Sequence, residues 1–249
     1  MNPRLHGRIA AITGGAKGIG AAAAKRFLQE DIEKVILVDL NLEQAEATAK
    51  ELDPTGEKVF AYACNVGDYD QVQQVFGEIE ARFGRIDILV NSAGITRDKT
   101  LLKMTKEMWD DVINVDLNSM YNVCKAVCPG MKARDYGKIV NMSSMAYLGA
   151  GGQANYSSAK AGILGFTRAL ARELAKHNIT INAICPHAVM TDMILAMPPE
   201  ILEQRLNLFP RKRAAQPEEV AAVIAFLSSD DSSFVNGEKI IINDGRACT

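Results

Sequence analysis

The chain has 249 residues, an apolar fraction of 48% and a formal net charge of −2. An apolar fraction of this size supplies a large core and excludes an intrinsically disordered chain. Acidic and basic residues are spread along the sequence, which excludes the basic footprint of a nucleic-acid-binding protein. No stretch approaches the roughly 20 apolar residues of a membrane span, and the first residues lack the plan of a signal peptide. We therefore expect a cytoplasmic protein without a membrane segment.

The cysteines predict neither a disulfide framework nor a metal centre. They are odd in number and contain no CxxC pair; they are Cys64, Cys124, Cys128, Cys185 and Cys248. Cys124 and Cys128 share one face of a predicted helix, but no histidine or acidic cluster accompanies them. Scattered thiols of this kind are typical of reduced cysteines in an intracellular protein. We expect no bound metal.

Seven short runs of apolar and β-branched residues predict strands. Most of these runs are apolar without a break, as strands buried on both faces are. They cover residues 8–13, 34–40, 58–63, 87–91, 138–142, 180–184 and 239–242. Longer segments between them predict helices at residues 18–30, 42–52, 68–83, 105–134 and 153–177. A last helix starts at Pro217, with Glu218 and Glu219 in its first turn, where proline and acidic residues are favoured.

The regular alternation of strand and helix predicts a parallel sheet with right-handed crossovers. No linker, repeat or low-complexity tract interrupts the pattern. We therefore expect an α/β fold with a single doubly wound, Rossmann-like domain over residues 1–249 and a sheet of about seven parallel strands flanked by helices. Residues 1–140 would form its cofactor half, and residues 141–249 its catalytic and substrate half.

The first predicted strand ends in a glycine-rich turn, TGGAKGIG at residues 13–20, and a helix opens directly after it. Glycines let the backbone approach a pyrophosphate, and the free N–H groups at a helix start face the anion. Ordinary tight turns also use glycine, so the loop alone leaves both interpretations open. Asp39 closes the second strand about 20 residues later, where an acid can accept the adenosine ribose hydroxyls. Asp39 may be read instead as the cap of the next helix, but loop and acid together predict dinucleotide binding.

Asp39 also favours NAD(H) over NADP(H). A carboxylate at the adenosine 2′ position would repel a 2′-phosphate, at a cost of about 4 kcal/mol for charges about 4 Å apart at a dielectric near 20. Lys17 argues the other way, because a basic residue before the second glycine of such a loop is a feature of NADP-using proteins that resemble this chain. The lysine stem is flexible, whereas Asp39 is fixed at a strand end. We therefore expect NAD(H) to be preferred.

Tyr156 and Lys160 lie four residues apart at the start of a predicted helix, on one face. An unperturbed tyrosine titrates at about pH 10, but a nearby ammonium favours the phenolate form. Tyr156 would then exchange a proton with a carbonyl or alcohol oxygen. The alternative is an ordinary surface pair of tyrosine and lysine at this spacing.

Ser143 follows the strand at 138–142, and Asn91 ends the strand at 87–91. The carboxyl ends of parallel strands face one ligand crevice, so we expect these residues to meet there.

These motifs, in this order and spacing, resemble the short-chain dehydrogenase/reductase family over essentially the whole chain. The matching pieces are the loop at 13–20, the NNAG-like residues 91–94, Asn114, the set Ser143, Tyr156 and Lys160, and the segment 186–191. The resemblance implies an oxidoreductase that interconverts a ketone and a secondary alcohol with NAD or NADP.

The resemblance also implies roles for individual residues. Tyr156 would be the general acid/base, and Ser143 would hydrogen-bond the substrate oxygen. Lys160 would bind the nicotinamide ribose and assist Tyr156, and Asn114 would hold a water in a proton relay to Lys160. The backbone of Val189 and the side chain of Thr191 would hold the carboxamide. The cofactor contacts would come from Thr13, Gly14, Lys17, Gly18, Ile19, Gly20, Asp39, Asn65, Val66, Asn91, Ala93, Gly94, Tyr156, Lys160, Pro186, Val189 and Thr191.

Within the family, the chain is most similar to the bacterial 3-oxoacyl-ACP reductase and acetoacetyl-CoA reductase branch. The segments GITRD at 94–98, GGQANY at 151–156 and TDM at 191–193 carry this similarity. It implies reduction of 3-oxoacyl thioesters in fatty acid biosynthesis, and docking of an acyl carrier protein at Arg134 and Arg172. The alternatives are a dehydrogenase of a free secondary alcohol, such as a hydroxysteroid or polyol, and a non-catalytic dinucleotide-binding protein. The two arginines would otherwise be solvated helix charges.

The resemblance further implies a homotetramer, or at least a dimer, because the family pairs its long helices across two-fold axes. The small residues Ala159, Gly162 and Gly165 would permit close packing there.

Several positions depart from the family pattern. Asn65 replaces an aspartate that contacts adenine, and Ser92 replaces the second asparagine of NNAG. His187 follows Pro186 where the family has glycine; it would either shape the substrate pocket or tilt away from it. The segment 192–216 resembles the family's lid, and its basic run at 211–213 would meet a phosphate or remain a solvated turn.

Overall fold

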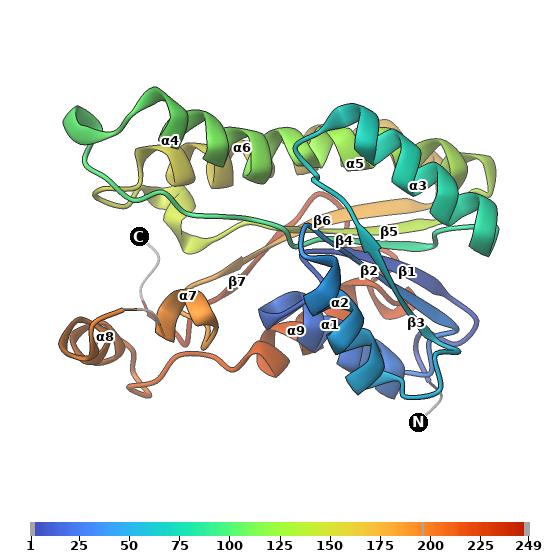
Figure 1. Cartoon of the computed structure of the whole chain (residues 1–249), viewed down its shortest axis with the longest axis horizontal. Coiled ribbons are helices and arrows are strands. Elements are labelled where there is room, and N and C mark those ends of the chain that lie inside the picture. Colours follow the sequence, from blue (N-terminus) through green and yellow to red (C-terminus); the bar gives the residue numbers. More distant parts are fainter. Residues whose placement is uncertain (1–2, 196, 247–249) are drawn as a thin grey trace.

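The structure, a computed structural model of the chain, describes residues 3–195 and 197–246. All seven strands pair in parallel within one sheet, in the order β3-β2-β1-β4-β5-β6-β7 (Figure 1). The strands are β1 (Ile9–Thr13), β2 (Lys34–Asp39), β3 (Val59–Ala63), β4 (Ile88–Asn91), β5 (Gly137–Met142), β6 (Ile179–Pro186) and β7 (Lys239–Ile242). The predicted parallel, doubly wound sheet is confirmed, and the predicted strand bounds differ by no more than two residues.

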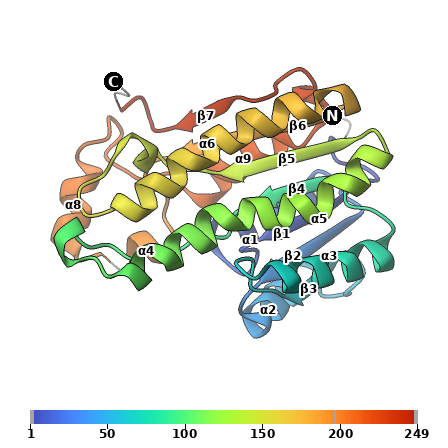
Figure 2. The same cartoon turned by 90° about the horizontal axis from the view of Figure 1, so that it is seen from above.

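Helices cover both faces of the sheet (Figures 1 and 2). One face carries α1 (Gly18–Gln29), α2 (Leu42–Leu52) and α9 (Pro217–Leu227), and the other carries α3 (Tyr69–Phe83), α5 (Ser119–Ala133) and α6 (Ala154–Leu174). Alternate residues of β1 serve the two sides: Ala10 and Ile12 pack in the core under α1 and α9, and Ile9 and Ala11 pack under α3 and α5. This alternation is the period-two geometry of a strand buried on both faces.

The strand order reverses at β1. The chain runs outward from β1 through β2 to β3 and then returns to β4 on the other side of β1. In doubly wound sheets, ligands bind at the carboxyl ends of the strands beside such a reversal. The loops that follow β1, β4, β5 and β6 therefore surround one crevice.

The helix predicted at 105–134 is not continuous. It divides into α4 (Lys106–Val112), a π-helical segment (Ile113–Asn118) and α5. A π-helical turn carries one additional residue per hydrogen-bonded ring, and such turns are frequent at functional sites. The insertion changes which side chains face α6 beyond residue 112. The prediction of one continuous helix over residues 105–134 was therefore wrong.

The lid segment contains two short helices that the sequence did not predict, α7 (Asp192–Leu195) and α8 (Pro199–Leu206). A small apolar cluster, which includes Ala188, Ile194 and Phe209, packs beneath them. The predicted start of α9 is confirmed, and Glu219 accepts a hydrogen bond from the Gln216 backbone N–H at 2.8 Å in a capping box. None of the described helices combines the length and apolar character needed to cross a bilayer.

Candidate active site

The loop after β1 has room only for glycine at several positions. A Cβ atom on Gly20 would lie 2.2 Å from the carbonyl oxygen of Gly14, and one on Gly14 would lie 2.8 Å from the Cα atom of Ala93. Gly14 and Gly18 also have positive φ angles of 64° and 58°, which only glycine adopts without strain. The start of α1 at Gly18 turns free N–H groups toward the loop. This open, positively polarised backbone fits the pyrophosphate of a dinucleotide.

The carboxylate of Asp39 is held beside this loop. Its Oδ2 atom accepts a hydrogen bond from the Ala16 N–H at 3.0 Å, and its Oδ1 atom accepts one from the Asn41 N–H at 3.1 Å. The cap of α2 is Asn41, which accepts a hydrogen bond from the Gln44 N–H at 3.0 Å. Asp39 is therefore not the helix cap that the sequence left open, and it lies at the end of β2 with a fixed orientation.

Lys17 connects the glycine loop to the lid. Its Nζ atom lies 2.8 Å from Oδ2 of Asp192, the first residue of α7. The hydrogen bond to Asp192 raises the pKa of Lys17. Both side chains are largely exposed, so the ion pair contributes at most about 1 kcal/mol.

The loop after β4 is tied to its neighbours by buried polar groups. The Asn91 amide donates to Oδ1 of Asn141 on β5 at 2.9 Å, and the Asn141 amide donates to Oγ1 of Thr167 on α6 at 2.9 Å. Oγ1 of Thr13 accepts hydrogen bonds from the N–H groups of Ser92 at 3.1 Å and Ala93 at 3.3 Å. These bonds fix the ends of β1, β4 and β5 relative to one another.

The segment after β6 reaches the glycine loop. The Val189 carbonyl accepts a hydrogen bond from the Thr191 N–H at 2.7 Å. The Thr191 methyl carbon lies 3.4 Å from the position that a Cβ atom on Gly18 would occupy. Pro186 is buried at the end of β6. The structure thus brings Thr191 and the phosphate loop together.

The remaining expected cofactor residues lie around the same strand ends. Asn65 is exposed after β3, and its Oδ1 atom accepts a hydrogen bond from the Gly67 N–H at 3.0 Å. Val66 is buried, and its carbonyl accepts a hydrogen bond from the Asn122 amide at 3.0 Å. Ile19, in the first turn of α1, is partly buried and packs against the core beneath that helix.

Tyr156 and Lys160 face the same side of α6. The Lys160 Nζ atom lies 5.2 Å from the centroid of the Tyr156 ring, and the Lys160 side chain is buried. The hydroxyl of Ser143 donates a hydrogen bond to the Lys160 carbonyl at 2.8 Å, which holds the end of β5 against α6. The structure therefore brings Ser143, Tyr156 and Lys160 into one place, as the sequence spacing predicts.

Asn155 fixes the first turn of α6. It is fully buried, and its amide donates hydrogen bonds to the carbonyls of Arg97 at 3.1 Å and Met108 at 2.9 Å. Its Oδ1 atom accepts a hydrogen bond from the Tyr156 N–H at 2.8 Å. Three segments of the chain therefore hold the backbone of Tyr156 in place.

Lys160 has a carboxylate partner that the sequence analysis missed. Oδ2 of Asp116, in the π-helical segment, lies 2.9 Å from Nζ of Lys160, and the Asp116 side chain has no exposed surface. The other carboxylate oxygen accepts a hydrogen bond from the Ile95 N–H at 2.8 Å, and Lys160 also donates to the Met142 carbonyl at 3.1 Å. Burial is the largest single effect and lowers the pKa of Lys160, but Asp116, Tyr156 and Cys185 together outweigh it, so the pKa is raised.

Asn114, expected to hold a water in a relay to Lys160, makes its side-chain hydrogen bonds with Gly67 and Asn118. Its amide donates to the Gly67 carbonyl at 3.3 Å, and its Oδ1 atom accepts a hydrogen bond from Asn118 at 3.3 Å. Asn114 therefore secures the loop between β3 and α3, and Asp116 has the position beside Lys160. A signal for this was present, because Asp116 falls between Val112 and Met120 on one buried helix stripe. A lone acid on such a stripe indicates a buried partner.

Comparisons with known proteins agree with this geometry. A family model described as Enoyl-(Acyl carrier protein) reductase matches residues 14–247. The 3-oxoacyl-[acyl-carrier-protein] reductase of Thermotoga maritima is 44% identical over 243 residues, 97% of this chain and 98% of that protein. The acetoacetyl-CoA reductase of Cupriavidus necator is 40% identical over 239 residues, 96% and 97% of the two chains. A crystal structure of levodione reductase matches with a TM-score of 0.92 at 34% identity, covering 97% of this chain and 98% of that one.

The chain belongs to the short-chain dehydrogenase/reductase family. As a member of this family, it is an oxidoreductase that acts on CH–OH groups with NAD or NADP. The family and the enzyme class predicted from the sequence are thereby confirmed.

His187 contacts the lid of this short-chain dehydrogenase/reductase. Its Nε2 atom lies 2.9 Å from a guanidinium nitrogen of Arg246, and its ring meets Phe209 edge to face at 4.8 Å between centroids. Burial, together with the charges of Arg246 and Arg205, lowers the pKa of His187 to about 4. The imidazole is therefore neutral at physiological pH and packs under the lid.

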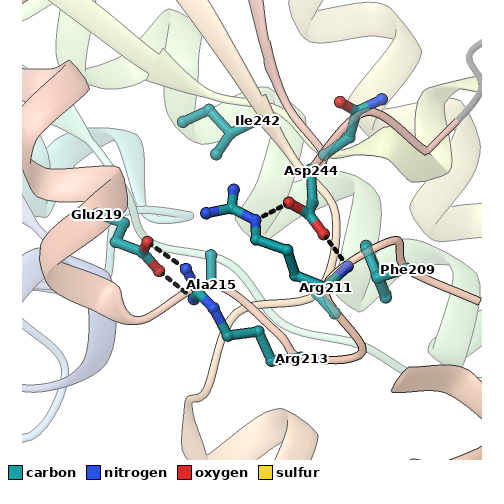
Figure 3. A pocket seen from close by; sticks show the side chains of 9 residues that line it. Phe209, Arg211, Arg213, Ala215, Glu219, Ile242 and Asp244 are labelled. Carbon is teal, nitrogen blue, oxygen red and sulfur yellow. Dashed lines mark hydrogen bonds and ion pairs between the residues drawn. The ribbon is translucent and has the colours of Figure 1, made fainter. Parts of the chain in front are cut away.

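The basic run 211–213 lies beside a small cavity of about 60 Å³ (Figure 3). Arg211 pairs with Asp244, and Arg213 pairs with Glu219 through two hydrogen bonds of 2.6 and 2.7 Å. Each arginine charge is thus already balanced by a carboxylate. This arrangement does not support a phosphate site at these two arginines.

The two arginines expected to meet a carrier protein differ in their surroundings. Arg134 pairs with Glu80 at 2.9 Å and donates to the Ile86 carbonyl at 3.0 Å, so it ties α5 to α3. Arg172 is exposed on α6 and, with Arg168, lines an open groove of about 290 Å³.

The described part of the chain holds no cluster of three or more His, Cys, Asp or Glu side chains with the geometry of a metal site. Among the described residues, Cys64, Cys124, Cys128 and Cys185 form no disulfide. Cys248 lies outside the described residues.

Proposed function

We propose that this short-chain dehydrogenase/reductase reduces 3-oxoacyl thioesters, carried by an acyl carrier protein or coenzyme A, to 3-hydroxyacyl thioesters. The observation that carries the proposal is the group of Tyr156, Lys160 and Ser143 beside a glycine loop that fits a dinucleotide. Relatives named as reductases of 3-oxoacyl carrier thioesters and of acetoacetyl-CoA, at 44% and 40% identity over almost the whole chain, favour the thioester.

In this proposal, Tyr156 is the general acid. Its hydroxyl protonates the carbonyl oxygen while the Ser143 hydroxyl, which rotates away from the Lys160 carbonyl, donates its one hydrogen bond to the same oxygen. When bound, the reduced nicotinamide supplies the hydride to the carbonyl carbon. Lys160 contributes a buried positive charge that favours the tyrosine anion left after proton transfer. Addition of the hydride to the carbonyl carbon and of the Tyr156 proton to the oxygen gives the secondary alcohol.

The cofactor lies, in this proposal, along the carboxyl ends of β1, β2 and β4 through β6. The part of the chain up to about residue 140 holds most of it, and the remainder carries the acid/base residues and the substrate. The pyrophosphate lies at the glycine loop, the adenosine ribose at Asp39, and the carboxamide at Val189 and Thr191. The other proposed contacts are those named above for the loops after β3, β4 and β6.

We propose NAD(H) as the preferred cofactor. The Asp39 carboxylate is fixed by two backbone N–H groups, so it cannot rotate away from a 2′-phosphate without losing both bonds. Lys17, the residue that would attract such a phosphate, is paired with Asp192. Both observations favour a ribose with free hydroxyls.

A second candidate function is the reduction of a free ketone or the oxidation of a free secondary alcohol. The observation that favours it is the close match to the crystal structure of levodione reductase, with a TM-score of 0.92. The proton-transfer group is the same in both proposals. They differ in the group attached to the reacting carbonyl, which is an acyl thioester in the first proposal and a free ketone or alcohol skeleton in the second.

Docking of an acyl carrier protein is proposed at the groove lined by Arg168 and Arg172. Both arginines are exposed, and together they outnumber the one carboxylate among the described residues that line the groove, Glu238, which leaves a net positive charge that suits an acidic partner. Arg134, committed to Glu80 and a backbone carbonyl, is left out of this proposed surface.

A homotetramer is proposed, with α5 and α6 at its subunit contacts. Large exposed side chains support it, namely Tyr121 on α5, 54% exposed, and Phe234 before β7, fully exposed. Of the small residues expected at the contact, Ala159 is buried within the chain and Gly162 packs against the π-helical segment. Only Gly165 opens to the surface, so the close packing we expected from all three is limited to this one.

Initial rates with acetoacetyl-CoA, an acetoacetyl carrier-protein thioester and a panel of free cyclic and linear ketones separate the two functions. We expect the thioesters to have the higher kcat/KM. Arg172→Glu should raise KM for the carrier thioester about tenfold and leave acetoacetyl-CoA unchanged, because a buried or rim charge pair contributes about 1 kcal/mol or more. Free ketones turned over faster than either thioester would replace the first proposal with the second.

Tyr156→Phe should lower kcat by about 10²–10⁴-fold, since it removes the acid/base hydroxyl. Binding of the cofactor, measured by calorimetry, should change little. Tyr62→Phe, which removes the same hydroxyl from β3, is the control and should keep full activity. Lys160→Ala should weaken both turnover and cofactor binding. A Tyr156→Phe enzyme with more than about a tenth of the normal kcat would show that another group transfers the proton.

The ratio of kcat/KM for NADH to that for NADPH tests the cofactor preference. We expect a ratio of about ten or more, because even a strongly screened repulsion between Asp39 and a 2′-phosphate exceeds about 1.4 kcal/mol. Asp39→Ala should move the ratio toward NADPH. Asp192→Asn is a matched change that frees Lys17 without touching Asp39, and it should move the ratio less. A normal enzyme that prefers NADPH contradicts the proposal.

Light scattering with the active enzyme tests the assembly. We expect a species of four chains of 27.0 kDa each, and Tyr121→Glu should shift it toward smaller species because it places a charge in an apolar contact. A normal enzyme that is monomeric and fully active at micromolar concentration is the contrary result.

A further inference from the structure

The ion pair of Lys160 and Asp116 lies at the centre of the proposed acid/base site. The two charged atoms are 2.9 Å apart, and the side chains are 3% and 0% exposed. The contact is an ion pair rather than a well-aligned hydrogen bond, because Oδ2 of Asp116 has no hydrogen-bond partner. Asp116 therefore acts on Lys160 through its charge.

The surrounding structure holds the pair in this arrangement. The Ile95 N–H donates to the other oxygen of Asp116 at 2.8 Å and holds the carboxylate in its orientation toward Lys160. A Cβ atom on Gly94 would lie 3.0 Å from Oδ2 of Asp116 and 3.3 Å from Nζ of Lys160. Because Gly94 has no side chain, the charged groups of Asp116 and Lys160 have the space that they occupy.

The titratable groups that act on Lys160 come from three elements. They are Asp116 in the π-helical segment, the Tyr156 phenol on α6 and the Cys185 thiol on β6. Asp116 is the carboxylate among them, and the Met142 carbonyl of β5 completes the contacts of the ammonium. Lys160 has three N–H donors and uses one of them on the Met142 carbonyl, so donor capacity remains for a ribose hydroxyl.

We propose that Asp116 keeps the Tyr156–Lys160 pair fully protonated to higher pH than a neutral residue would, and thereby extends the pH range in which the enzyme reduces carbonyl groups. The inference rests on the proposed role of Tyr156 as general acid. Asp116 touches neither the substrate nor the reacting atoms in this proposal, so it is a positioning residue that acts through Lys160.

The direction follows from charge alone. A negative charge beside the pair disfavours the loss of any proton from it, whether the proton leaves Tyr156 or Lys160. Reduction needs Tyr156 with its proton, so loss of that proton limits the rate at high pH. Removing the charge of Asp116 makes this loss easier. The alkaline limb of the reduction profile must then move to lower pH.

The experiment compares kcat/KM for reduction of acetoacetyl-CoA by NADH as a function of pH. Asp116→Asn should move the alkaline limb to lower pH by about one unit or more, the shift typical of an opposite or like charge within a few ångströms. Asp110→Asn, the same change at an exposed carboxylate on α4 that pairs with Lys106, should leave the limb in place. Asp116→Glu, which keeps the charge, should remain close to the normal profile.

A second readout does not depend on turnover. Ultraviolet titration of tyrosinate, as the difference between a protein and its Tyr156→Phe counterpart, should show the same downward shift in the enzyme without cofactor. Asp116→Ser provides a second neutral variant if Asp116→Asn folds poorly, because its smaller side chain leaves room for water at Lys160. A limb that stays in place or moves up in the neutral variants overturns the inference. Turnover that survives in Tyr156→Phe would instead refute the proposed function.

Discussion

The charge of Lys160 must be satisfied inside the protein, and the elements around the site are arranged to do so. An isolated buried ammonium costs several kcal/mol, and two contacts offset that cost. The Met142 carbonyl comes from the end of β5 and the Asp116 carboxylate from the π-helical segment, while the Ser143 hydroxyl bonds the backbone carbonyl of Lys160. Because each partner lies on a different element, satisfying one charge also fixes where β5, α6 and the π-helical segment meet.

The same constraint explains the irregular helix. A regular helix continued beyond Val112 would keep the 3.6-residue period, whereas a π-helical turn inserts a residue and changes the direction of the side chains that follow. With the insertion, Asn114 reaches the Gly67 carbonyl and Asp116 reaches Lys160. One local irregularity therefore serves both the loop after β3 and the interior of the site.

Much of the fold was predictable because the strands are buried on both faces and read as unbroken apolar runs. The spacing of Ser143, Tyr156 and Lys160 also predicted their meeting, since strand ends and a helix start are placed by the topology of the sheet. The partner of Lys160 was not predictable in the same way. Asn114 and Asp116 are two residues apart, and the resemblance to the family pointed to Asn114, although the buried stripe of Val112, Asp116 and Met120 carried a signal for Asp116. The helices α7 and α8 were missed because they are short and lie over the sheet edge, where apolar periodicity is weak.

The ion pair between Lys17 and Asp192 has a consequence for how the enzyme responds to its medium. It links the loop that would hold the cofactor phosphates to the first turn of the lid, and both side chains are largely in solvent. Dissolved salt screens exposed pairs, with a Debye length of about 10 Å at 0.1 M and about 3 Å at 1 M. Ionic strength therefore acts directly on the connection between the phosphate loop and the lid. Added salt thus weakens this contact more than it weakens the buried ion pair of Lys160 and Asp116 in the interior of the site.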